Sequence, residues 1–331
     1  MPPGPLLSQP PDGARPTRSG LASGGVALIG YGEVGRILAE DLRAAGVAVT
    51  AFDIKLHGEF GEPLREHALR HGVTLAEAHA PAVQAAGLVI SAVTASQAVP
   101  VSQACAPGLV AGAFFLDVNS ASPGAKLRAA TLVNAAGGRF VEGAVMTSVP
   151  PYRIKVPLLL GGPDAAALQP HLAALGFAPR VASDRLGVAS ATKMCRSVMI
   201  KGLEAMVIES LTAARHYGVE DAVIASLYET FPGIDWERQA AYFFQRVIEH
   251  GRRRSEEMRE VAETAREAGL TPWSAAGTAE RLAWVADLAE SGIFGARGSP
   301  GFARSADWRP EADRILANTP ADPAPQREGL T

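Results

Sequence analysis

The fold is decided by residues 26–35, which read Val26-Ala27-Leu28-Ile29-Gly30-Tyr31-Gly32-Glu33-Val34-Gly35. Four apolar residues predict a buried strand, and the glycine spacing that follows is typical of a turn into a helix. A helical pattern of apolar residues then runs to Leu42, and a second apolar run over 47–52 is closed by Asp53. Strand, glycine turn, helix and strand within about 30 residues indicate the βαβ unit of a doubly wound sheet.

This turn predicts a dinucleotide site. Gly30 permits the tight turn, Gly32 lets the backbone approach a pyrophosphate, and Gly35 allows the helix to pack closely on the strand. The helix N-terminus supplies N–H donors and a favourable dipole. Asp53 would bind ribose hydroxyls and repel a 2′-phosphate, so we expect NAD, with NADP possible because Lys55 is nearby. The alternative is a structural glycine turn with a capping aspartate. The expected cofactor-binding residues are Gly30, Tyr31, Gly32, Glu33, Val34, Gly35, Asp53, Ala92 and Val93.

The alternation of strand and helix continues and then stops. Further apolar runs that predict strands lie at 88–93, 113–118, 139–142 and 158–160. Such alternation indicates a mostly parallel sheet. After Leu186 the pattern becomes helical, at 189–216, 221–231, 236–248, 255–268 and 274–289. We therefore predict an α/β Rossmann domain followed by an all-α domain. The expected segments are a disordered leader (1–24), a nucleotide-binding domain (25–186), a helical substrate and dimerisation domain (187–297) and a flexible tail (298–331).

Composition excludes several functional classes. The 331 residues are 47% hydrophobic and 20% charged, with a net charge of −3. The absence of basic excess argues against nucleic-acid or anionic-membrane partners. No apolar run is long enough to span a membrane, and two cysteines, Cys105 and Cys195, exclude a disulfide framework and fit a cytoplasmic location. We expect Cys195 to be a small buried hydrophobe. No metal site is predicted.

Several segments resemble the β-hydroxyacid dehydrogenase superfamily, which includes 6-phosphogluconate and 3-hydroxyisobutyrate dehydrogenases. Besides the glycine turn, they are 117–123 (Asp-Val-Asn-Ser-Ala-Ser-Pro), 141–145 and 187–193 (Gly-Val-Ala-Ser-Ala-Thr-Lys). The stretch 250–258, with Glu260, Glu263 and Thr264, is similar to the phosphogluconate-dehydrogenase-like branch of that superfamily. The resemblance implies hydride transfer between an alcohol and a carbonyl group and a homodimer formed through the helical domain.

The resemblance also implies a substrate site. The family's motif after the fourth strand borders substrate and nicotinamide, and Asn119 and Ser120 stand at its hydrogen-bonding positions. The alternative is a polar turn capped by Ser120 or Ser122 before Pro123. Where the family has a glycine pair, this chain has Met146-Thr147-Ser148, which puts the identity of the substrate in doubt. The expected substrate-binding residues are Asn119, Ser120, Ser122, Thr147, Arg196 and Ser197.

The family's catalytic lysine corresponds to Lys193. Helical spacing places Lys193, Ser197, Lys201 and Glu204 on one face. A neighbouring stripe of Val188, Met194, Val198 and Met206 is predicted to be buried. Partial burial would favour the neutral lysine, which could take a proton from a substrate hydroxyl. The alternative is a surface lysine whose stem covers apolar neighbours.

Two further interpretations stay open. Arg252 and Arg253 stand four residues before Glu256 and Glu257, so they could form surface ion pairs or bind the acid group of a small anionic substrate. The whole chain could also be a non-catalytic dinucleotide-binding sensor or scaffold, because fold alone does not establish function. Retention of Lys193 favours an oxidoreductase acting on a small hydroxy acid, with possible decarboxylation of a 3-keto acid.

Overall fold

The structure is a computed structural model that describes residues 25–319. The expected leader and the last twelve residues of the expected tail lie outside this range. The described residues form two compact units. The sheet unit comprises 25–93, 97–119 and 125–189, and the helical unit comprises 94–96, 120–124 and 190–319. Two short loops, 94–96 and 120–124, group with the helices, which the sequence did not indicate.

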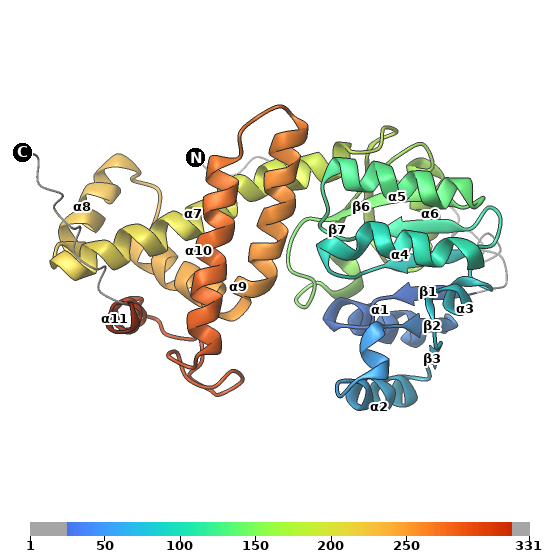
Figure 1. The fold of residues 1–331 in the computed structure, drawn as a ribbon, viewed down its shortest axis with the longest axis horizontal. Coiled ribbons are helices and arrows are strands. Elements are labelled where there is room, and N and C mark those ends of the chain that lie inside the picture. The colour runs from blue at the N-terminus through green and yellow to red at the C-terminus, as the bar shows by residue number, and fades with distance from the viewer. Residues whose placement is uncertain (1–24, 320–331) are drawn as a thin grey trace, which may run out of the picture. The chain divides into compact units, whose positions relative to one another are not determined.

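An eight-stranded sheet forms the centre of the sheet unit within residues 25–319 (Figure 1). Its strands are β1 (Val26–Ile29), β2 (Val49–Phe52), β3 (Thr74–Leu75), β4 (Leu88–Ser91), β5 (Phe114–Asp117), β6 (Arg139–Val145), β7 (Pro157–Gly161) and β8 (Ala178–Ser183). Their spatial order is β3-β2-β1-β4-β5-β6-β7-β8. Every neighbouring pair is parallel except β6 and β7. The order reverses at β1, so the carboxyl ends of β1 and β4 flank the switch point at which such sheets bind ligands.

Helices connect these strands. They are α1 (Glu33–Ala44), α2 (Gly61–His71), α3 (His79–Val83), α4 (Ala98–Cys105), α5 (Pro123–Ala135) and α6 (Ala165–Ala174). Strands β1, β4 and β5 are buried throughout, which explains why each reads as a continuous apolar run rather than an alternating one. The predicted mostly parallel, doubly wound sheet is confirmed.

Two strands were not predicted. β3 has only two residues, too few to produce a pattern. β8 lies at the edge of the sheet, alternates between exposed and half-buried residues, and contains Pro179, which demotes a run as a strand candidate. The reversed direction of β7 was also missed, because strand polarity is not encoded in hydropathy.

The helical unit contains long helices, as expected. They are α7 (Val188–Tyr217, whose first two residues belong to the sheet unit), α8 (Glu220–Thr230), α9 (Trp236–Glu267), α10 (Trp273–Glu290) and α11 (Arg309–Asn318). The predicted helices at 236–248 and 255–268 are one continuous helix, α9. A Cβ on Gly251 would lie 2.9 Å from the carbonyl oxygen of Leu282 on α10, so this glycine permits close helix packing rather than a break.

Three predictions about individual segments are wrong. The expected flexible tail contains α11, anchored by the buried side chains of Trp308 and Ile315. Cys195 is exposed, whereas Cys105 is buried. Met206 is 62% exposed, although Met194 on the same predicted stripe is buried. A repeat of apolar residues that does not match 3.6 residues per turn rotates gradually around the helix axis. Over the eighteen residues from Val188 to Met206, this rotation carries the apolar positions off the buried face.

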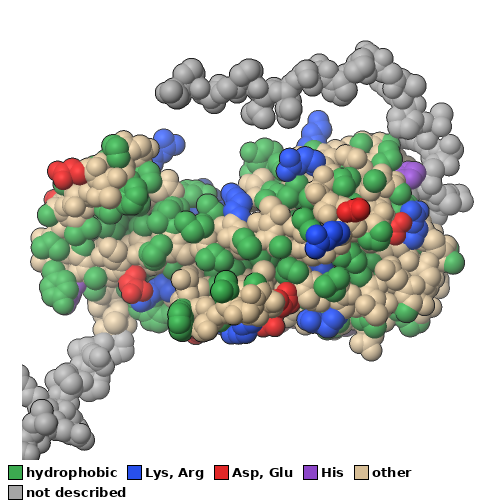
Figure 2. Space-filling model, turned by 90° about the horizontal axis from the view of Figure 1, so that it is seen from above, with side chains coloured by type: hydrophobic (Ala, Val, Ile, Leu, Met, Phe, Trp, Pro, Cys, Tyr) green, Lys and Arg blue, Asp and Glu red, His purple; other side chains and the backbone are tan. Residues whose placement is uncertain are grey.

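Surface charge is mixed. On the face drawn in Figure 2, basic and acidic side chains are interspersed among apolar ones. None of the helices within residues 25–319 is long and apolar enough to cross a membrane.

Candidate active site

The glycine turn has the geometry that its spacing predicts. Gly30 has φ +96°, and a Cβ there would lie 2.3 Å from the carbonyl oxygen of Ala92. A Cβ on Gly35 would lie 2.1 Å from the carbonyl oxygen of Gly30, so α1 packs directly against the turn. A Cβ on Gly32 would meet no atom of residues 25–319 within 4 Å, which leaves an open approach to the backbone. One glycine shapes the turn, one packs the helix, and one faces open space where a pyrophosphate can approach.

Tyr31 anchors this turn to the sheet unit. Its side chain is completely buried, and its hydroxyl forms a 2.8 Å hydrogen bond with Nδ1 of His67. Its backbone N–H donates to Oδ2 of Asp53 over 2.8 Å. Burial raises the pKa of Tyr31 to about 12, so the phenol remains protonated at neutral pH.

Asp53 stands immediately after β2, as predicted. Its Oδ1 accepts a hydrogen bond from the backbone N–H of Lys55 over 2.9 Å, and its Oδ2 accepts from Tyr31. Each carboxylate oxygen has a further lone pair for a ribose hydroxyl. The other expected cofactor residues surround the turn: Glu33 and Val34 open α1, and Ala92 and Val93 follow β4.

Asn119 joins the ends of two strands. Its Oδ1 accepts from the N–H of Val93 at 2.6 Å, and its Nδ2 donates to Oγ of Ser91 at 2.9 Å. Its own N–H donates to Oδ1 of Asp117. The side chain is 4% exposed. Its amide therefore fixes the carboxyl edge of the sheet and positions the residues that follow, and a role for Asn119 in binding substrate stays a prediction.

Asp117, which accepts the hydrogen bond from Asn119, belongs to a buried ion pair. Nζ of Lys126 is 3.3 Å from Oδ1 of Asp117 and donates to the backbone carbonyl of Asp117 over 2.8 Å. Both side chains are fully buried. This pair stabilises the turn that follows β5.

In the helical unit, Lys193 meets Ser120. Nζ of Lys193, in the second turn of α7, donates to Oγ of Ser120 over 2.6 Å. Lys193 is half-buried. Sequence reasoning named both residues, and the structure brings them together across 73 positions of the chain. An ammonium and a hydroxyl at one point form a donor pair suited to the oxygen of an alcohol or carbonyl group.

Two carboxylates of α9 hold the loop that carries Ser120. The N–H of Ser122 donates to Glu260, and its hydroxyl donates to Glu267 over 2.8 Å. The N–H of Gly124 donates to Glu267 over 2.9 Å. These acids cap the N-terminus of α5, where negative charge is favourable. Ser122 is therefore engaged in fixing the loop. Glu260 belonged to the stretch that resembles the family, but no sequence signal indicated Glu267, which is 145 positions away.

Buried ion pairs connect α7 with α9. Nζ of Lys201 lies 2.6 Å from Oε2 of Glu257, and Arg254 pairs with Glu204. Burial would raise the pKa of Glu257, but the charges of Lys201, Arg253 and Lys193 outweigh it and hold that pKa at about 2. Glu257 is thus ionised at neutral pH, and its negative charge acts on Lys193 as well. These pairs fix the face of α7 from which Lys193 extends.

Comparisons with known proteins agree with this geometry. Residues 25–176 match the family model of the NAD binding domain of 6-phosphogluconate dehydrogenase, and residues 214–285 match a domain of unknown function, DUF1932. A conserved hypothetical protein from Sinorhizobium meliloti 1021 is 35% identical, with 88% of this chain and 95% of that chain covered and a TM-score of 0.68. The conserved protein MTH1747, whose structure was described as similar to 3-hydroxyacid dehydrogenases, is 31% identical over 78% of this chain and 97% of its own, with a TM-score of 0.62.

The chain belongs to the β-hydroxyacid dehydrogenase superfamily. A solved member, the 3-hydroxyisobutyrate dehydrogenase of Mycobacterium tuberculosis, shares the fold at 16% identity, with 88% of this chain and 98% of that chain covered and a TM-score of 0.61. The resemblance inferred from sequence is confirmed. Residues 25–176 are an NAD-binding domain of this superfamily.

The remaining expected residues are less closely engaged. Ser197 is buried beside Lys193 on α7, whereas Arg196 and Thr147 are exposed. In the stretch typical of the phosphogluconate-dehydrogenase-like branch, Arg252 pairs with Asp287 and Glu290 of α10 rather than with Glu256. Arg253 pairs with Glu257, as one interpretation held. Arg252, Arg253 and Arg254 all have carboxylate partners, which disfavours this stretch as an anion site.

Proposed function

We propose that this superfamily member is an oxidoreductase that interconverts a small hydroxy acid, or a related polar alcohol, and its carbonyl product, with Lys193 as the acid/base. The observation that supports this most directly is the 2.6 Å hydrogen bond from Nζ of Lys193 to Oγ of Ser120. This contact supports the proposal because it joins an amine that can transfer a proton, on the half-buried Lys193, to a hydroxyl that can orient a substrate oxygen.

A nicotinamide nucleotide held at Gly30, Gly32 and Gly35 would supply the hydride acceptor for oxidation or the hydride donor for reduction. In the oxidation direction neutral Lys193 removes the hydroxyl proton, and the electron pair of the O–H bond forms the C=O bond as the hydride leaves. Ser120 hydrogen-bonds the same oxygen and orients it. In the reverse direction the ammonium of Lys193 protonates the forming alkoxide.

The substrate is proposed to be anionic. Arg196 is exposed one helical turn beyond Lys193, so its guanidinium is available to bind a carboxylate or phosphate. If the substrate is a 3-hydroxy acid, its 3-keto product can lose carbon dioxide. Trapping the released carbon dioxide would distinguish decarboxylation from simple oxidation.

NAD is proposed as the preferred nucleotide. Asp53 stands at the end of β2 with its carboxylate fixed by two backbone N–H groups. A fixed negative charge favours ribose hydroxyls over a 2′-phosphate. Replacement of Asp53 by Asn should raise the affinity for NADP relative to NAD, which calorimetric titration of both nucleotides would measure.

The decisive experiment is a turnover assay. NADH oxidation is followed with a panel of small keto acids and semialdehydes, and NAD reduction with the matching hydroxy acids. Lys193→Ala should reduce kcat by roughly 10²–10⁴-fold while leaving the Kd for NAD unchanged. Ser120→Ala should give a smaller loss. Lys155→Ala, at an exposed position in the sheet unit, is the matched control and should behave like the parent protein.

Full turnover in Lys193→Ala would refute the assignment of the acid/base. If the chain binds NAD but turns over no compound in the panel, the sensor or scaffold interpretation gains support. In that case nucleotide binding should alter another measurable property, such as oligomeric state.

We further propose a homodimer formed by the helical unit. Five large apolar side chains of the helical unit are highly exposed: Met199 (72%), Met206 (62%), Tyr217 (76%), Leu270 (65%) and Trp273 (81%). Exposed apolar side chains of this size are typical of surfaces that associate. Light scattering should give twice the chain mass, and Met206→Asp should shift the equilibrium toward monomer; a monomeric parent protein would refute the proposal.

A further inference from the structure

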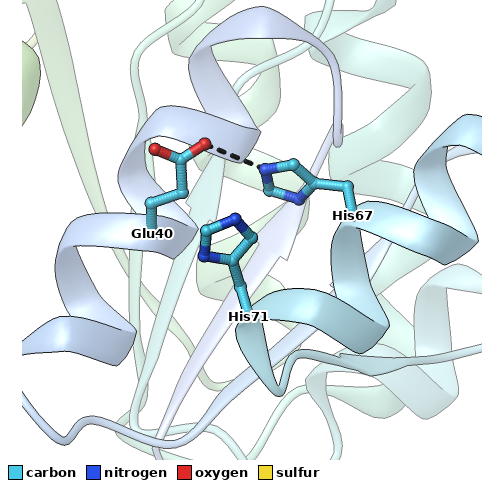
Figure 3. A group of neighbouring side chains, drawn as sticks. All are labelled: Glu40, His67 and His71. Carbon is cyan, nitrogen blue, oxygen red and sulfur yellow. Dashed lines mark hydrogen bonds and ion pairs between the residues drawn. The ribbon is translucent and has the colours of Figure 1, made fainter.

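Two histidines and a glutamate converge in the sheet unit, outside the proposed active site. Glu40 extends from α1, and His67 and His71 extend from α2 (Figure 3). One potential ligand atom from each of the three residues lies within 4.8 Å of the others. Nε2 of His67 is 2.9 Å from Oε1 of Glu40. The imidazole rings of His67 and His71 have centroids 4.5 Å apart.

The helical spacing produces this convergence. Residues four apart on a helix share a face, so His67 and His71 both extend from the same side of α2. α1 packs beside α2 and presents Glu40 to that side. Two histidines at this spacing with one carboxylate form a donor set that binds transition metals in proteins.

A neighbouring hydroxyl fixes the orientation of His67. Nδ1 of His67 is bonded to the phenolic oxygen of Tyr31 over 2.8 Å, which leaves Nε2 directed at Glu40. A ligating histidine usually donates its other ring N–H to an oxygen, which sets its tautomer. Tyr31 can play that part, because its oxygen can accept from Nδ1–H when a metal occupies Nε2.

The ligand atoms and the charges around them favour a transition metal. Arg153 contacts Oε2 of Glu40 at 2.7 Å and Oδ1 of Asp41 at 2.7 Å, so Asp41 offsets its charge. The guanidinium of Arg43 donates to the backbone carbonyls of Val47 and His71, so its hydrogen bonds go to the main chain and not to the Glu40 carboxylate. Mg²⁺ and Ca²⁺ need several oxygen ligands, which these three residues do not provide. Ions with affinity for imidazole, such as Zn²⁺, Co²⁺ and Ni²⁺, fit the donors better.

We propose that Glu40, His67 and His71 bind a divalent transition-metal ion, with water completing a four-coordinate site. The metal would displace the hydrogen bond between His67 and Glu40 and link α1 to α2. Because Tyr31 is both the partner of His67 and a residue of the glycine turn, the ion would also stabilise the base of the nucleotide site. No metal was expected from the sequence, because Glu40 and His67 stand 27 positions apart and no metal-binding motif spans them.

Calorimetric titration tests the proposal. The full chain, without a histidine tag and dialysed against chelator, is titrated with ZnCl₂, and one ion per chain should bind. His71→Ala, at a half-buried position, should weaken binding at least tenfold. Tyr31→Phe keeps the ring but removes the hydroxyl and should weaken binding about tenfold. His216→Ala, an exposed histidine of the helical unit, is the matched control and should leave affinity unchanged.

A second measurement guards against unfolded variants. Zn²⁺ should raise the melting temperature of the parent protein, and the rise should be lost in His71→Ala but kept in His216→Ala. Absence of binding up to millimolar Zn²⁺, or equal affinity in the parent and His71→Ala, would overturn the proposal. Both readouts are independent of turnover, so their outcome does not depend on the proposed oxidoreductase activity.

Discussion

The sheet unit and the helical unit use buried charge in different ways. In the sheet unit, the buried ion pair of Lys126 and Asp117 also holds main-chain groups at the carboxyl edge, and Glu142 accepts from the N–H of Ala189 where α7 begins. In the helical unit, buried charges pair side chain to side chain: Lys201 with Glu257 and Glu204 with Arg254. The first arrangement fixes loops next to strands, and the second fixes one helix against another. Buried charge thus serves backbone geometry in one unit and helix register in the other.

The largest expected effect comes from Lys126→Met. This change removes a fully buried ammonium and leaves the Asp117 carboxylate without its counter-charge. We expect the free energy of unfolding to fall by about 3–5 kcal/mol, because an uncompensated buried charge is costly. Urea denaturation measures the loss. Lys155→Met, at an exposed position, should change stability by about 0.5 kcal/mol or less. Equal stability of the two variants would show that the Lys126 pair is not needed to hold the backbone.

The second effect concerns Glu257 and its dependence on pH. The pKa of Glu257 is about 2 in the folded chain and 4.5 in its ordinary state. Between these values the unfolded chain binds a proton at Glu257 that the folded chain does not. The stability that Glu257 contributes is therefore present above pH 4.5 and lost as pH falls toward 2.

Comparison with Glu257→Gln isolates this contribution. The stability difference between the parent protein and Glu257→Gln should shrink by up to about 3 kcal/mol as pH is lowered through this window. Urea denaturation at several pH values provides the measurement. A difference that stays constant from pH 6 to pH 3 would mean that Glu257 does not depend on Lys201 in the way the geometry indicates.

A smaller effect is expected from Glu142→Gln. The glutamine keeps the shape and one acceptor, but it lacks the charge that strengthens the hydrogen bond from Ala189. The free energy of unfolding should fall by about 1–2 kcal/mol. Glu62→Gln, at a site whose side chain is 68% exposed, is the control and should have little effect. A loss above that of Lys126→Met would reverse the ranking of the two sheet-unit sites.

The smallest effect is expected from Arg252→Gln. Its partners, Asp287 and Glu290, are more than half exposed, and such surface pairs contribute about 0–1 kcal/mol. Stability should change by no more than that, and the difference should vanish at high salt. Turnover should be unchanged. A large rise in KM would instead restore the interpretation of this stretch as a substrate anion site.

The sequence predicted the sheet unit in more detail than the helical unit, for physical reasons. Buried parallel strands such as β4 read as apolar runs, and Gly30 and Gly35 each stand where a Cβ would collide with a backbone carbonyl oxygen. Lys193 and Ser120 were each named through family motifs, and the structure joins them by a hydrogen bond.

The contacts of Glu267 with Ser122 and of Lys201 with Glu257 could not be predicted, because spacing along one helix does not show which other helix packs beside it. The helices predicted at 236–248 and 255–268 are one helix, and Gly251 between them permits close packing against α10.

The buried phenol of Tyr31 has a consequence for how the glycine motif is read. The consensus leaves the position between its first two glycines free, as though any amino acid would serve. In this chain that position is completely enclosed and tied at both ends, by its hydroxyl to His67 and by its N–H to Asp53. A wild-card letter in a consensus therefore conceals a site-specific constraint, and redesign of the turn for another nucleotide would have to retain this tyrosine or rebuild the pocket around it.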